Sequence, residues 1–280
     1  MGFVAGSPRV GSGAGPRRSS ICGLVKEVQG STPYTLCSSG YNVDVALLLI
    51  HPIGVGLSRR YWRKFLGDYD GATSTVDVYA PDLIGCGENK KAKGRISLDM
   101  ICDDLETFIE EEIKKPVILL SEGALAGATI ELAARLEGRG LRGVILSTPP
   151  AIQFFSIGVN KAIATASWTF FSSPLGVLLF YYVRRREFLK NFTEKNLFTG
   201  KADEDWLDDL EGDAKDIRGR WAVFSFLASE WRKDFRPKMA QIESPTLMIL
   251  GDQIKIISNS TFQDSVEKRF DNYGEALPWK

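Results

Sequence analysis

The sequence of 280 residues has a single histidine, four cysteines and no excess charge of either sign, since 35 Lys and Arg balance 35 Asp and Glu. Zero net charge argues against nucleic acid as the main partner. Cys22, Cys37, Cys86 and Cys102 lack CxxC or other metal-ligand spacing, so we expect reduced thiols, no metal and no cofactor. Any mechanism that needs an imidazole base must use His51.

The first 26 residues have the composition of a leader segment. Residues 1–26 contain several Gly and Ser, four basic residues and no acidic one. Organelle transit peptides share this composition, whereas a secretory signal has a continuous apolar core that is absent here. We therefore place residues 1–26 outside the fold, with chloroplast targeting as the working hypothesis. A flexible leader on a cytoplasmic protein, or an uncertain gene start, is the alternative.

From residue 43 onward, apolar runs alternate with helical patterns. The runs span residues 45–50, 76–80, 116–120, 141–146 and 246–250, and helical spacing covers 98–113 and 124–136. Continuous apolar runs are typical of strands buried on both faces of a parallel sheet. The pattern predicts an α/β fold, with a mostly parallel sheet, helices on both faces and a core of residues 27–149 and 245–280. Ligands of such sheets bind at the carboxyl ends of the strands.

Residues 150–244 form a different region, rich in Phe and Trp, and we expect an inserted helical lid over the strand ends. No charge occurs from Ala162 to Val183, and three arginines follow. Ser172, Ser173, Pro174 and Gly176 interrupt this apolar stretch. Three interpretations stay open: lid helices packed on the core, a peripheral membrane contact through residues 162–186, or a membrane span. The acidic residues at 203–209 lack the spacing of a calcium loop and indicate a solvated helix face.

Four motifs follow the predicted strands. They are His51-Pro-Ile-Gly-Val-Gly, Asp82-Leu-Ile-Gly-Cys-Gly, Ser121-Glu-Gly-Ala-Leu and Gly251-Asp-Gln. In this order they resemble the loops of the α/β-hydrolase superfamily, in the branch that holds epoxide hydrolases and haloalkane dehalogenases. The segment 48–59 is similar to a plant and cyanobacterial plastid subgroup. The resemblance implies a nucleophile on a strand-to-helix elbow, an oxyanion hole, and an acid and a histidine that complete a triad.

The implied triad is incomplete in this sequence. The elbow alignment places Gly123 at the nucleophile position, and glycine has no side chain to attack a substrate. A shifted register would make Ser121 the nucleophile. Asp252 matches the acid position, as a vestigial triad member or as a turn cap, and no histidine follows it. The pattern places His51 in the oxyanion loop, where we expect it to hold the loop by hydrogen bonds.

The oxyanion hole is better preserved than the triad. Pro52 has no N–H group, but the donors that the resemblance implies are the backbone N–H groups of Ile53 and Ala124, and both residues have one. We therefore predict a non-catalytic protein of the α/β-hydrolase fold that binds a small apolar molecule or a protein partner. The alternative is a carboxylic-ester or lipid hydrolase with a non-standard nucleophile, either Ser121 or a water activated by Glu122 or Asp252. Cys86 has no His partner and no basic setting, so it is a poor nucleophile.

Overall fold

A computed structural model describes residues 25–38, 42–69, 76–150, 159–197 and 200–249. In these ranges one sheet has the order β1-β2-β4-β3-β5-β6-β7. Strand β2 runs antiparallel to both of its neighbours, β1 and β4. Strands β4, β3, β5, β6 and β7 are parallel to one another. The strands are β1 (Val25–Val28), β2 (Tyr34–Cys37), β3 (Ala46–Ile50), β4 (Asp77–Pro81), β5 (Val117–Glu122), β6 (Leu141–Ser147) and β7 (Thr246–Ile249).

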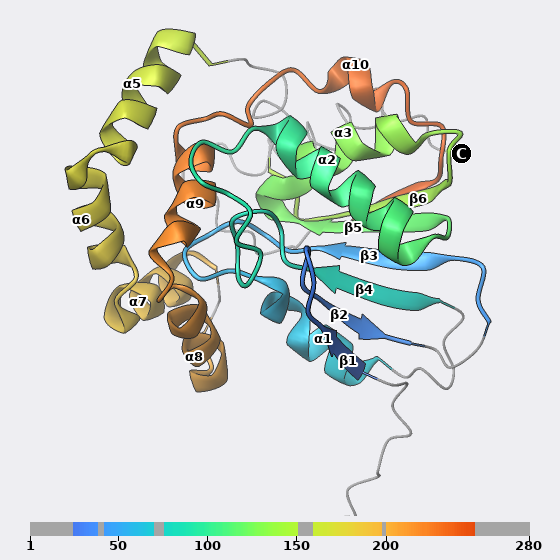
Figure 1. Ribbon diagram of the computed structural model, residues 1–280, viewed down its shortest axis with the longest axis horizontal. Coiled ribbons are helices and arrows are strands. Elements are labelled where there is room, and N and C mark those ends of the chain that lie inside the picture. The colour runs from blue at the N-terminus through green and yellow to red at the C-terminus, as the bar shows by residue number, and fades with distance from the viewer. Residues whose placement is uncertain (1–24, 39–41, 70–75, 151–158, 198–199, 250–280) are drawn as a thin grey trace, which may run out of the picture.

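The central strands are apolar because helices cover both faces of the sheet (Figure 1). In β3, Leu48 packs into the cluster under α2 (Leu98–Phe108) and α3 (Ala126–Leu136), and Leu49 packs on the opposite face beside Trp62 and Leu66. A π-turn (Ile109–Ile113) extends α2, and α10 (Arg236–Met239) packs on α3. The opposite face is covered by the 3-10 turn η1 (Arg59–Trp62) and α1 (Arg63–Asp68). Alternate residues of each strand therefore serve opposite faces.

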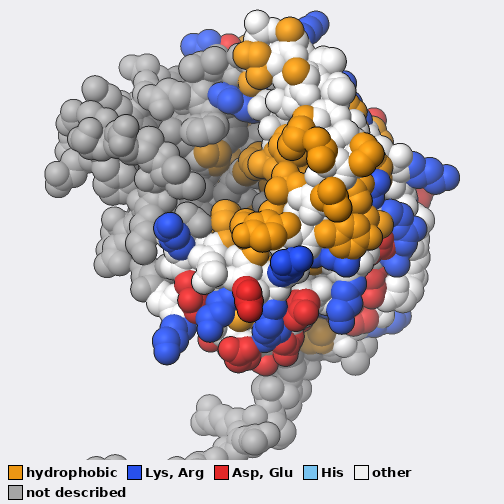
Figure 2. Space-filling view, turned by 90° about the vertical axis from the view of Figure 1, so that its left-hand side faces the viewer, with side chains coloured by type: hydrophobic (Ala, Val, Ile, Leu, Met, Phe, Trp, Pro, Cys, Tyr) orange, Lys and Arg blue, Asp and Glu red, His pale blue; other side chains and the backbone are white. Residues whose placement is uncertain are grey.

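Between β6 and β7 the chain forms a helical lid beyond the carboxyl ends of the strands (Figure 1). It contains α5 (Lys161–Ser172), α6 (Pro174–Val183), α7 (Arg186–Asn196), α8 (Glu204–Asp213), the 3-10 turn η4 (Ile217–Gly219) and α9 (Arg220–Leu227). Phe180, Val223 and Phe224 form its buried centre, and Val55 of the loop after β3 packs against them. The predicted α/β class with a parallel sheet and an inserted lid is confirmed. One face of the lid carries a cluster of apolar side chains (Figure 2).

Two antiparallel strands at the sheet edge differ from the prediction, which placed no strand before residue 43. Strand β1 begins at Val25, two residues before the predicted start of the core at residue 27, and pairs with β2 from Val25↔Cys37 to Val28↔Tyr34. Residues 1–24, with most of the predicted transit peptide, lie outside the described residues. Chloroplast targeting therefore stays a prediction.

The acidic residues at the start of α8 are mostly exposed to solvent, as the sequence pattern indicated, and the helix also forms ion pairs. It faces two basic segments, the η1–α1 region of the core and the start of α7. The pairs are Arg60–Asp213, Arg63–Asp209, Lys64–Asp203 and Arg186 with Glu204, Asp208 and Glu211. Because the partners lie far apart in sequence, no local spacing reveals them. Within the described ranges, no group of three or more His, Cys, Asp or Glu residues is placed to hold a metal ion.

Candidate functional site

The turn after β5 has the strand-to-helix geometry of the elbow that the resemblance implies, and Gly123 stands at its start. Strand β5 ends at Glu122, and the 3-10 turn η3 (Gly123–Leu125) leads directly into α3. Gly123 has φ +61°, a left-handed backbone conformation that residues other than glycine rarely adopt. A Cβ built on Gly123 meets no atom within 4 Å. A side chain at Gly123 would therefore project into open space at the carboxyl end of the sheet.

Ser121 lies inside β5, opposite Ile50 of β3 and Leu146 of β6. Its side chain is fully buried, and its hydroxyl has no hydrogen-bond partner among the described residues. A nucleophile must reach both a base and the substrate. The position of Ser121 within the strand therefore weighs against the shifted register.

The backbone N–H groups of Ile53 and Ala124 belong to loops at the carboxyl end of the sheet, where the resemblance implies an oxyanion hole. In η3 the first hydrogen bond runs from the Ala126 N–H to the Gly123 carbonyl, so the N–H of Ala124 has no partner within the turn. Ile53 follows β3, the strand next to β5, and its half-buried side chain packs on the main core cluster. The topology thus brings the loops that carry both N–H groups to the same end of adjacent strands.

His51 joins two loops and is not free to act as a base. Its Nδ1 donates to the Pro52 carbonyl at 2.8 Å, and its Nε2 accepts from the Leu83 N–H at 3.1 Å. These partners fix the neutral tautomer with the proton on Nδ1. The ring is completely buried, and this burial lowers the pKa of His51 below its ordinary value. His51 therefore holds the loop after β3 against the loop after β4.

Two polar side chains meet at the ends of β5 and β6. Thr148, which follows β6, donates its hydroxyl to the Glu122 carboxylate and has φ +42°. Burial and the nearby Glu122 charge raise the pKa of Tyr61 well above its usual range. The Tyr61 ring also contacts Trp206 of α8, with the ring centroids 5.7 Å apart. Sequence reasoning missed Thr148, because a positive φ outside glycine has no sequence signature, and it missed Tyr61, because its contacts come from residues far away in sequence.

A buried ion cluster supports the loop after β4. Asp82 is fully buried, and its carboxylate accepts from the Arg59 guanidinium and from the N–H groups of Arg59 at 2.9 Å and Glu88 at 2.8 Å. Arg59 also donates to Glu27 and Glu88. A Cβ on Gly87 would lie 2.5 Å from the Asp82 carboxylate, so the glycine is required by this packing. Asp82 thus acts as the centre of a loop scaffold.

Cys86 lies in the same loop and is also fully enclosed. Burial raises the pKa of its thiol well above the usual range, and the charge of Asp82 adds to this effect. The thiolate is the nucleophilic form of cysteine. Cys86 is therefore held as an unreactive thiol.

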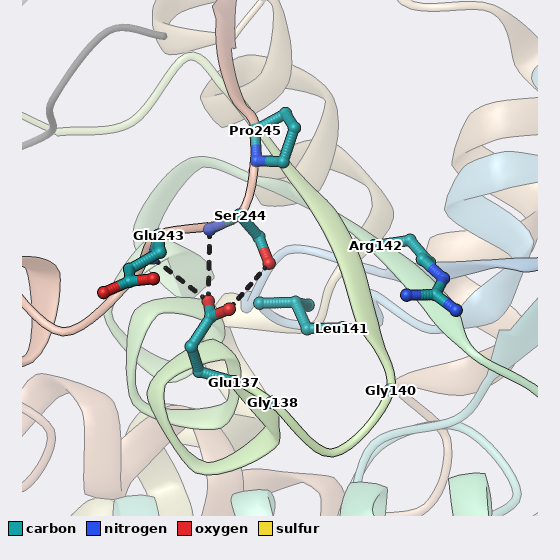
Figure 3. A pocket seen from close by; sticks show the side chains of 8 residues that line it. All are labelled: Glu137, Gly138, Gly140, Leu141, Arg142, Glu243, Ser244 and Pro245. Atoms are coloured by element: carbon teal, nitrogen blue, oxygen red, sulfur yellow. Dashed lines mark hydrogen bonds between the residues drawn. The ribbon is translucent and has the colours of Figure 1, made fainter.

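A pocket of about 380 Å³ lies at the other end of the strands from the elbow (Figure 3). Leu141 and Pro245, at the amino ends of β6 and β7, line it. The Glu137 carboxylate accepts from the N–H groups of Glu243 and Ser244, both at 3.2 Å, and from the Ser244 hydroxyl at 3.0 Å. These bonds tie the chain before β7 to the end of α3. The pocket therefore has a structural explanation and lies away from the elbow.

The predicted site residues divide into three groups. Gly123, Ala124, Ile53 and His51 lie at the carboxyl end of the sheet, and Ser121 lies within it. Asp252 and the tail after it fall outside the described residues.

A mostly parallel sheet of this order, an elbow after β5 and a helical insertion between β6 and β7 define a protein of the α/β-hydrolase fold. Residues 47–271 match the model of the Alpha/beta hydrolase family, and the chain belongs to this family. No curated protein matches the sequence significantly.

Solved structures with the same fold carry different activities in their names. A serine hydrolase involved in carbazole degradation has a TM-score of 0.66 at 15% identity, with 91% of this chain and 86% of that chain covered. A haloalkane dehalogenase from Bradyrhizobium elkani has 0.62 at 15%, with 91% and 86% covered. An enol-lactonase from Burkholderia xenovorans has 0.59 at 16%, with 88% and 85% covered. At these identities the likeness concerns the fold alone.

Proposed function

We propose that this protein is a non-catalytic member of the family that binds an apolar, carbonyl-bearing molecule at the elbow. The observation that carries the proposal is Gly123, which has the left-handed backbone of the elbow and open space where a nucleophile would project. Without a nucleophile the acyl-enzyme route is closed.

The other nucleophile and base candidates support the same conclusion. The Ser121 hydroxyl is enclosed within β5, and both nitrogens of His51 are occupied by loop hydrogen bonds. The Glu122 carboxylate, the remaining candidate base in the described ranges, accepts the Thr148 hydroxyl. A water-directed reaction would have to compete with this bond.

The same edge retains what binding needs. The Ala124 N–H is free of turn hydrogen bonds and suits a carbonyl or carboxylate oxygen. In the lid, the rings of Trp168 and Trp221 lie against each other, with 5.8 Å between the ring centroids. Ile53 and Trp221 pack on the same core cluster. The expected ligand therefore combines an apolar body with one oxygen acceptor.

Calorimetry with two chain-length-matched probes tests this proposal. Methyl laurate carries a carbonyl and dodecyl methyl ether does not, so we expect the ester to bind about tenfold tighter, the value of one net hydrogen bond. Gly123→Leu should abolish binding by filling the open space, whereas Gly123→Ala has the same backbone cost and should retain it. Equal binding of the two probes, or unchanged binding by Gly123→Leu, contradicts the proposal. Release of methanol from the ester would instead show catalysis.

A further inference from the structure

Helix α6 is apolar on every side but largely exposed. Its sequence Pro-Leu-Gly-Val-Leu-Leu-Phe-Tyr-Tyr-Val has no charged residue, and only Gly176 and Phe180 are buried. Leu175 and Leu178 are 61% and 64% exposed. A helix that is hydrophobic all round is normally enclosed by protein or by membrane. The exposed side chains form part of the apolar cluster seen in Figure 2.

Helix α5 continues this surface on the other side of a fixed bend. The two helices are bent by 74° at Ser173. The Ser173 hydroxyl caps α6 and donates to the Phe170 carbonyl at 2.6 Å, and a Cβ on Gly176 would overlap the Phe171 carbonyl oxygen. On α5, Ile163 is 61% exposed. The bend therefore presents apolar side chains of both helices as a preformed edge.

Helices α5 and α6 together are apolar and long enough to cross a membrane, and the 74° bend between them favours lying on one instead. Helices α5 and α6 have 12 and 10 residues, so they are about 18 and 15 Å long at 1.5 Å per residue. A hydrocarbon core is about 30 Å thick. No single helix in the described part of the chain is long and apolar enough to cross a membrane. A bent pair of this size suits insertion into one leaflet.

Basic side chains border the apolar surface (Figure 2), and two of the arginines stack on tyrosine rings. Arg184 stacks on Tyr181, with 4.3 Å between the guanidinium carbon and the ring centroid, and Arg185 stacks on Tyr182 at 5.6 Å. Within the described residues, Arg185 and Lys190 have no carboxylate partner, unlike Arg186, which is paired to α8. Aromatic rings and basic side chains are the groups that favour the interface of an anionic bilayer.

We propose that α5, α6 and the first residues of α7 (residues 161–190, the α5–α6 edge) dock on the surface of an anionic lipid bilayer. The apolar side chains insert among the acyl chains, and Arg185 and Lys190 contact lipid phosphates. Charge complementarity favours this occupant over a second copy of the chain, because a twofold contact through the same edge would bring its unpaired cations together. The docking does not depend on the ligand proposed for the elbow.

Vesicle co-sedimentation of the full chain at low salt tests the proposal. Vesicles contain phosphatidylcholine alone or mixed with phosphatidylglycerol. We expect sedimentation with the mixed vesicles and its loss in high salt. Arg185→Gln with Lys190→Gln should weaken partitioning by about 30-fold, from about fivefold per charge. Leu175→Gln with Leu178→Gln should weaken it by on the order of 100-fold.

Two double variants serve as matched controls. Lys93 and Lys114 are exposed and have no ion partner among the described residues, and Leu227 and Phe65 are apolar residues exposed on α9 and α1. Replacing either pair with Gln should leave partitioning unchanged. The proposal fails if the wild type stays in the supernatant, or if the Leu175 and Leu178 variant sediments like wild type. It also fails if ultracentrifugation shows a dimer that this variant dissociates while neither form sediments with vesicles.

Discussion

Replacing Gly123 with serine restores the side chain that a hydrolase elbow carries, and the structure sets the expected cost. The left-handed backbone at φ +61° penalises a non-glycine residue by about 1–2 kcal/mol. A Cβ at this position meets no atom within 4 Å, so no packing cost is added. We therefore expect Gly123→Ser to fold and to lose about 1–2 kcal/mol of unfolding free energy in urea.

Two other glycines provide controls for this number. Gly138 has φ +72° and also has open space around its Cβ direction, so Gly138→Ser should lose a similar amount. Gly85 has φ +80°, but its Cβ would lie 2.6 Å from Ile96 Cδ1 and 3.2 Å from Ala92 Cβ. Gly85→Ser should therefore lose about 1–3 kcal/mol more through overpacking.

The new serine should remain inactive, because the sequence contains a single histidine and His51 has both nitrogens in hydrogen bonds. The assay is hydrolysis of p-nitrophenyl butyrate by wild type and Gly123→Ser. A general base contributes about 10²–10⁴-fold. A gain of that size in the variant would show a base at the elbow and would contradict the incomplete triad. A stability loss well beyond that of Gly138→Ser would refute the open space at Gly123.

Three further predictions concern the groups around the elbow. Ser121→Ala should raise the unfolding free energy by about 1 kcal/mol, because a buried hydroxyl without a partner is costly. Because His51 stays neutral when folded, protonation of the unfolded chain should lower stability as pH falls below about 6.5, by at most about 1.4 kcal/mol per pH unit, a component that His51→Gln lacks. Arg59→Ala leaves Asp82 buried without its cation and should cost about 3–5 kcal/mol, whereas Arg139→Ala at an exposed pair should cost below about 1 kcal/mol.

Urea titrations measure all three. A loss of stability in Ser121→Ala would reveal a partner for the hydroxyl. An unchanged pH profile in His51→Gln would show that the ring binds protons equally in the folded and unfolded chains. Equal losses in Arg59→Ala and Arg139→Ala would remove the cluster at Asp82 as the scaffold of its loop.

The parallel core was predictable because its signals are local. Strands buried on both faces need continuous apolar runs, and β3, β4, β5, β6 and β7 begin within one residue of the expected positions. Strand β1 has no such signal, since Val-Lys-Glu-Val lies at the sheet edge and is mostly exposed. An exposed edge strand often carries charged residues, so its sequence lacks the apolar run that predicts a buried strand and resembles that of a loop.

The position of Gly123 between a strand and a helix was predictable, because the small residues that follow the apolar run 116–120 mark such a turn. The contacts that support the site depend on long-range pairing, and single-sequence patterns do not contain it. Arg59 meets Asp82 across 23 positions, and Arg60 meets Asp213 across 153. The same limit explains why the sequence pattern of α8 did not reveal its ion pairs.

Labelling of the wild-type protein by a fluorophosphonate probe, followed by intact-mass measurement, tests the absence of an attacking side chain most directly. The structure predicts no adduct, because Gly123 offers no oxygen and Ser121 is enclosed. A stoichiometric adduct that maps to Ser121 and disappears in Ser121→Ala would contradict the account.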